Sequence, residues 1–196
     1  MGQTSNCEGT GQPARRRGLL ARFGRDRRGS TAIEFTMLAI PFAMLVFAIL
    51  ESCISFAGQE LMTSSMDTAA RQLRTGQVQP ATVTVTSLKQ MICKNMEIIV
   101  AKDCPGLLVD LRTPTSFADA ANYTFKISNG DIVLMKAAQV DPKQFVAEPG
   151  GSGAISILRV FYKWPVMTDF LAKSMANLNG GNTLQFATTT WKNETY

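Results

Sequence analysis

The sequence predicts an α+β protein: a long N-terminal hydrophobic helix of transmembrane type, followed by a small α+β domain with an antiparallel sheet. Three observations support this class. An Arg-rich segment opens the chain, one long uncharged apolar run follows it directly, and short segments rich in β-branched and aromatic residues fill the C-terminal half. A helical apolar run followed by strands and short helices is typical of an α+β domain carried on a membrane anchor.

The N-terminal segment, residues 1–29, is predicted to be a basic cytoplasmic leader. It carries seven Arg against two acidic residues, a net charge of +5, whereas residues 30–196 carry 13 basic and 13 acidic residues. Positive charge beside an apolar run stays on the cytoplasmic side of a membrane. The same charge is compatible with binding to nucleic acid or anionic lipid, but a nucleic-acid binder carries its excess charge on the folded domain. We therefore expect no nucleic-acid partner.

Residues 30–57 are predicted to form a hydrophobic transmembrane helix. The uncharged run from Phe35 to Leu50 has 16 residues, while a span needs about 20. The span must therefore include or border an acidic residue, Glu34 or Glu51, and such residues are costly in lipid and usually functional. Pro41 lies inside the run and is expected to kink or loosen the helix. A buried core helix is the alternative, but it leaves the Arg cluster unexplained.

The helical pattern continues beyond the apolar run, so residues 58–78 are predicted to extend the helix. Apolar residues recur at steps of three and four: Leu61, Met62, Met66, Ala69, Ala70 and Leu73. Two basic residues near the end, Arg71 and Arg74, suit a helix C-terminus, and Gly76 is a stop signal. A helix unbroken from Ser30 to Thr75 would be about 70 Å long, roughly twice what a bilayer needs.

Residues 79–196 are predicted to be an extracytoplasmic α+β domain. An amphipathic helix is expected over 84–99 and a second helix over 165–178. Alternation and β-branched residues predict five strands, over 107–112, 123–127, 131–135, 154–164 and 183–192. The last two are expected to pair antiparallel, and the Pro- and Gly-containing stretch 141–153 to be a loop. The strand 107–112 is predicted to be half-buried, with Val109 and Leu111 facing inward.

The residue types argue against an enzyme and against a metal or cofactor site. The chain has no His, the commonest general base and metal ligand. Cys93 and Cys104 flank the junction of the amphipathic helix and the first strand; outside the cytoplasm they would form a disulfide, worth about 2–3 kcal/mol. Two buried free thiols are the alternative. Cys53 is expected to be a small buried residue, and Cys7 to be incidental.

One constellation of residues marks the start of the apolar helix. Gly29 ends the charged leader, four residues follow, and Glu34 precedes Phe35 and the apolar run. A conventional signal peptide is cleaved after its apolar core, and Ser55-Phe56-Ala57 loosely fits such a site. Glu34 by itself is equally compatible with a helix N-terminal acid that stabilises the helix dipole.

The segment RRGSTAIEFTMLAIP resembles the prepilin cleavage site of Flp-type pilins and of TadE-like pseudopilins of the tight-adherence (Tad) pilus system. The segments CPGLLVDLRTPTSF, RVFYKWPVMTDFL and FATTTWKNETY are also similar to TadE-like proteins, so the resemblance covers residues 22–196. It implies a pilin-like fold and cleavage by a prepilin peptidase between Gly29 and Ser30. Two features depart from major Flp pilins: Phe35 stands where they have Tyr, and the chain is much longer.

The resemblance implies a minor pilin or pseudopilin that takes part in assembling a Tad pilus for adherence. Its assembly residues would be Ser30, Glu34 and Phe35: the free amine at Ser30 of one subunit would pair with the Glu34 carboxylate of a neighbour. The implied partners are the inner membrane, a prepilin peptidase, other pilin subunits and the pilus assembly platform. The protein would be single-pass, with a cytoplasmic N-terminus and a periplasmic domain, and would reach the cell surface after assembly. An uncleaved membrane scaffold or a secreted periplasmic binding domain are the alternatives.

Overall fold

The computed structural model describes residues 30–195. The chain divides into two units, with the boundary between Leu45 and Val46. The elements, in chain order, are α2 (Ser30–Arg74), a 3-10 helix (Pro80–Thr82), α3 (Val85–Met96), β1 (Leu107–Arg112), α4 (Phe117–Ala120), β2 (Tyr123–Ser128), β3 (Asp131–Lys136), β4 (Gln139–Val140), β5 (Ile155–Pro165), α5 (Asp169–Met175) and β6 (Asn182–Lys192). The predicted α+β class is confirmed.

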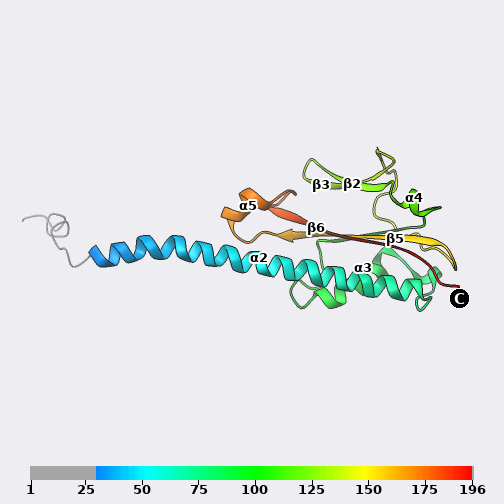
Figure 1. Cartoon of the computed structure of the whole chain (residues 1–196), viewed down its shortest axis with the longest axis horizontal. Coiled ribbons are helices and arrows are strands. Elements are labelled where there is room, and N and C mark those ends of the chain that lie inside the picture. Colours follow the sequence, from blue (N-terminus) through cyan, green and yellow to red (C-terminus); the bar gives the residue numbers. More distant parts are fainter. Residues whose placement is uncertain (1–29, 196) are drawn as a thin grey trace, which may run out of the picture. The chain divides into compact units, whose positions relative to one another are not determined.

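The strands form two antiparallel sheets of three strands each, in the orders β1-β5-β6 and β2-β3-β4. The long β5 lies in the middle of the first sheet and pairs with all of β6, from Ile155 opposite Lys192 to Pro165 opposite Asn182. The predicted antiparallel pairing of the last two strands is therefore confirmed. Figure 1 shows three layers in this unit: α3 and the C-terminal half of α2, then the β1-β5-β6 sheet, then the smaller sheet.

The main core fills the space between the helices and the first sheet. The C-terminal half of α2 buries residues at helical spacing, among them Met62, Met66, Ala69 and Leu73. They pack in one cluster with α3 and with side chains from alternate positions of β1, β5 and β6. A second cluster around Phe161 and Leu134 lies between the two sheets. The first sheet is therefore covered on both faces.

Local sequence sets the ends of the two main helices. After α2, Gly76 has a φ of 70°, a left-handed conformation that glycine adopts without strain. The Gln77 amide donates to the Gln72 carbonyl and the Gly76 amide to the Leu73 carbonyl, which together form a Schellman motif. At the start of α3, Thr84 and Ser87 cap each other's backbone amides in a capping box. Both signals are visible in the sequence.

The structure corrects several predicted elements. β1 is buried along nearly its whole length rather than half-buried, because the smaller sheet and the 141–149 segment cover its second face. The predicted helix 165–178 is shortened to α5, because Pro165 ends β5 and the first turn starts after Thr168. The predicted helix over 84–99 ends at Met96. The sequence analysis missed the short elements α4 and β4.

Candidate functional site: the apolar helix and its junction with the domain

The N-terminal part of α2 exposes apolar side chains on every side. The large ones are Ile33, Phe35, Met37, Leu38, Ile40, Phe42, Met44, Leu45, Val46, Phe47, Ile49, Leu50, Ile54 and Phe56. A helix that is apolar all round requires a non-aqueous environment, either a bilayer or other apolar helices. Among the described residues, one helix is long and apolar enough to cross a membrane, and its best window has a mean hydropathy of 2.3. This part of α2 is a candidate membrane anchor.

The assembly residues predicted from the sequence lie in the first turns of α2. Ser30 is its first residue, Glu34 follows one turn later, and Phe35 is exposed. Gly29 lies outside the described residues, and so does Cys7. The helix is assigned without a break through Pro41.

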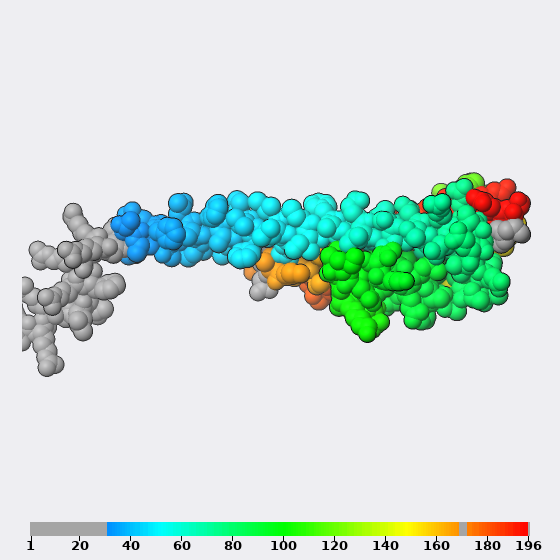
Figure 2. Space-filling view, turned by 90° about the horizontal axis from the view of Figure 1, so that it is seen from below, coloured from blue at the N-terminus to red at the C-terminus, as the bar shows by residue number. Residues whose placement is uncertain are grey.

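Glu51 joins α2 to the corner between β5 and α5. Its carboxylate accepts hydrogen bonds from the Thr168 hydroxyl at 2.6 Å and from the backbone amide of Met167. Thr168 is also the N-cap residue of α5. Figure 2 shows the segment around residue 165 lying against α2. The acid that ends the uncharged run therefore holds the domain directly to the helix, without an intervening linker.

Further contacts continue the junction along β6. The Gln185 side chain donates to the Ser55 carbonyl at 2.8 Å, and the Gln59 side chain donates to the Phe186 carbonyl at 2.9 Å. Between these contacts, Gly58 is buried against the ring of Trp164, where an added Cβ would overlap the ring. From Glu51 onward, α2 is thus an integral part of the domain.

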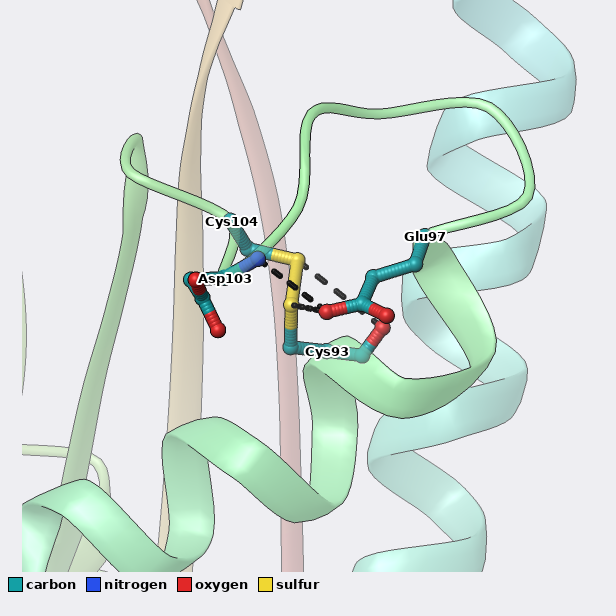
Figure 3. Close-up of a disulfide and its surroundings, with 4 residues drawn as sticks. All are labelled: Cys93, Glu97, Asp103 and Cys104. Atoms are coloured by element: carbon teal, nitrogen blue, oxygen red, sulfur yellow. Dashed lines mark hydrogen bonds between the residues drawn. A yellow bond between two sulfur atoms is a disulfide. The ribbon is translucent and has the colours of Figure 1, made fainter.

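A disulfide joins the end of α3 to the chain that enters β1. It links Cys93 and Cys104, both buried, and Figure 3 shows Glu97 beside it. The Glu97 carboxylate accepts a hydrogen bond from the Asp103 amide at 3.0 Å. Asp103 and Cys104 have positive φ angles of 62° and 42°, a conformation that side chains disfavour. The disulfide and this hydrogen bond both hold the loop in that conformation.

The structure also contains a buried ion cluster that the sequence analysis did not anticipate. Asp110 is fully buried, and its carboxylate binds Arg159 Nη2 at 2.6 Å and Arg112 Nε at 3.0 Å. Arg112 also pairs with Asp141 at 3.3 Å, so two acids balance two bases. Arg159 donates to the Thr124 carbonyl of β2, which ties the two sheets together. The sequence did contain one indication of a buried charge: Arg159 lies in the middle of the apolar strand AISILRVFYKW.

The other titratable groups of the described residues show no metal-type cluster and a few pKa shifts with local causes. No group of three His, Cys, Asp or Glu suited to a metal exists within residues 30–195. The pKa shifts arise from surface pairs: the Lys163 hydrogen bond lowers the pKa of Asp131, and the Thr115 amide lowers the pKa of Asp119. Burial raises the pKa of Tyr162. Cys53 is exposed, so its predicted burial is wrong; it lies on a face of α2 that the domain leaves uncovered.

In the comparison with known proteins, one family model matches the chain, over most of α2. Residues 29–71 match the family model described as TadE-like protein, which confirms the resemblance seen in the sequence over this stretch. No curated protein and no solved structure matches the chain. The matched residues are the start of the described chain, the apolar part of α2 and most of its buried part.

Proposed function

We propose, because residues 29–71 match the TadE-like family model, that the protein is a minor pilin or pseudopilin of a Tad-type pilus. The family match supports a protein associated with this pilus. The observation that carries the finer proposal is the apolar part of α2: it exposes large apolar side chains all round and directly follows an Arg-rich segment ending in Gly29-Ser30. Such a helix can reside in a bilayer and later pack against identical or similar helices.

Processing after Gly29 would keep the whole of α2 in the mature protein. The domain depends on α2 for the contacts of Glu51 with Thr168 and of Ser55 with Gln185. Cleavage after Ala57 would remove both contacts and would cut a helix immediately before the Gly58–Trp164 contact. These contacts support a cleavage site before the apolar run rather than behind it.

The leader and the anchor together favour a single-pass topology in the inner membrane. The seven Arg of residues 1–29 would remain in the cytoplasm, and the domain from Glu51 onward would lie in the periplasm. A periplasmic location also suits the Cys93–Cys104 disulfide, because disulfides persist in oxidising compartments. The partners would be a prepilin peptidase, other pilin subunits and the assembly platform.

The decisive experiment determines the N-terminal residue of the mature protein by mass spectrometry of membrane fractions, with and without an active prepilin peptidase. The proposal expects a chain that starts at Ser30 only when the peptidase is present. An intact leader in both samples would instead indicate a permanent membrane scaffold. A start at Gly58 would indicate a secreted periplasmic domain.

A further inference from the structure

The end of the domain that Glu51 holds carries exposed apolar side chains. Met167 is 70% exposed and Ile99 is 37% exposed. They line one groove together with Pro105 and Trp164. We call Ile99 and Met167 the apolar foot. Apolar side chains that are grouped on a surface mark a contact with a partner more often than isolated ones do.

The height of the apolar foot along α2 follows from the Glu51 contact. The Met167 amide donates directly to the Glu51 carboxylate, and helical side chains tilt toward the helix N-terminus. Met167 therefore lies level with Glu51 or slightly toward the apolar run. The residues just before Glu51 are apolar and exposed, including Phe47, Ile49 and Leu50. Met167 thus lies at about the level along α2 where these exposed apolar residues end.

The number of residues in a membrane span places Glu51, and with it Met167, relative to the bilayer. If a span of about 20 residues ends at Leu50, then Glu51 is the first residue in the headgroup layer, which is roughly 5–7 Å thick on each side. If the span instead begins at Phe35, it runs beyond Glu51, and the corner lies deeper still. In both registers Met167 lies at the headgroup layer or below it.

We propose that the apolar foot inserts into the outer headgroup layer of the membrane that holds α2, so that the domain rests on the bilayer instead of standing clear of it. The Glu51 contact joins α2 and the domain without a linker, so this end of the domain lies beside the residues at which the span ends. Apolar side chains at this level contact the headgroup and acyl-chain boundary, as they do in interfacial helices. The inference rests on the membrane anchoring contained in the proposed function.

The test uses the full chain with Cys7→Ser and Cys53→Ser and with the native disulfide retained. A single NBD fluorophore is attached at Met167→Cys, and the protein is reconstituted into phosphatidylcholine vesicles with or without bromine on the upper acyl chains. The expected result is loss of NBD emission in the brominated vesicles, at a protein-to-lipid ratio low enough to separate the copies. Undiminished emission with a spectrum typical of water would overturn the inference.

Two labelled control variants show whether a negative result contradicts the membrane contact of the apolar foot or the membrane insertion of α2. Phe47→Cys reports insertion of α2 and must lose emission; if it does not, the anchor itself is wrong. Phe117→Cys is a matched exposed apolar site, 56% exposed, beside Ile157 in a groove near the far end of β5. Ile157 and Pro165 are about 26 Å apart along the strand, so the Phe117 label should keep its emission.

A second copy of the chain is the competing occupant of the foot. In that case the Met167 label would be shielded from water but not quenched by bromine, and the shielding would grow with the protein-to-lipid ratio. That outcome would overturn the membrane contact and assign the foot to an interface between subunits.

Discussion

Gly58 is the residue that allows α2 to approach the sheet closely. It is buried against the six-membered ring of Trp164, and a Cβ at this position would overlap that ring. Glycine weakens a helix interior by about 1 kcal/mol relative to alanine, so its place here is explained by packing rather than by helix propensity.

We predict that Gly58→Ala destabilises the domain by about 1–3 kcal/mol, because overpacking of a rigid aromatic contact outweighs the gain in helix propensity. The free energy of unfolding of the full chain is measured by urea titration in detergent. Gly151→Ala is the matched control, since no atom lies within 4 Å of its added Cβ; it should change stability by less than about 0.5 kcal/mol. Equal effects of the two substitutions would contradict the packing account.

Glu34 is the residue whose role the resemblance, and not the structure, assigns. We predict that Glu34→Gln strongly lowers the amount of this protein in sheared pilus fractions while leaving its membrane level unchanged. Between apolar helices, loss of the carboxylate leaves the Ser30 amine of a neighbour as an unpaired buried charge, which costs about 3–5 kcal/mol. Glu60→Gln on the exposed face of the same helix is the control. Normal assembly of the Glu34 variant would end the pairing hypothesis.

At the scale of elements, α2 is one helix with two surfaces. Its N-terminal part is apolar all round and exposed, and its C-terminal part is amphipathic and buried on one side. The change occurs between Glu51, which binds the β5–α5 corner, and Met62, which is fully buried. The same helix therefore serves two environments in sequence, lipid or neighbouring helices first and the domain core second.

The disulfide is the covalent connection between two elements, α3 and β1. We predict that replacing Cys93 and Cys104 together by Ser lowers the free energy of unfolding by about 2–3 kcal/mol, because the bond restricts the unfolded chain and its short loop limits the size of that effect. Denaturation with and without reductant checks this: reductant should destabilise the wild type and leave the double variant unchanged. Cys53→Ser should behave as the wild type does, and an equal loss in that variant would point to a different cause.

At the scale of the domain, the buried ion cluster connects the two sheets. Asp110 on β1 binds Arg159 on β5, and Arg159 reaches the backbone of β2. Asp110 also accepts a hydrogen bond from the Val146 amide at 3.1 Å, which fixes the segment that covers β1. With two acids and two bases the cluster is neutral, which is how a protein interior can hold charges.

We predict that Asp110→Asn destabilises the domain by about 3–5 kcal/mol, because two buried guanidinium groups lose their shared carboxylate. Thermal and urea unfolding of the full chain give the measurement. Glu194→Gln removes the exposed pair with Arg74, whose side chains are half exposed, and should cost at most about 1 kcal/mol. If the two substitutions proved equally mild, the cluster would not be what holds the sheets together.

Much of the secondary structure was predictable because its signals are local. The three- and four-residue spacing of Met62, Met66, Ala69 and Leu73 predicts their burial, and Gly76 marks the end of α2. The strands β5 and β6 are rich in β-branched and aromatic residues. The apolar run and the Gly29-Ser30 junction are equally local, which is why the sequence alone indicated the family.

The tertiary structure alone decided which polar residues are buried and which distant segments meet. The alternation in β1 predicted Asp110 and Arg112 on a solvent face, but the second sheet covers that face, and covering requires partners from residues far along the chain. The contact of Glu51 with Thr168 joins residues 117 positions apart. By itself the sequence determined the class, the apolar run and the end of α2 at Gly76, since neighbouring residues set periodicity and capping. The ends of the later helices, the ion cluster and the corner at Glu51 arose only from packing of the whole domain, because burial and charge pairing depend on what lies opposite in space.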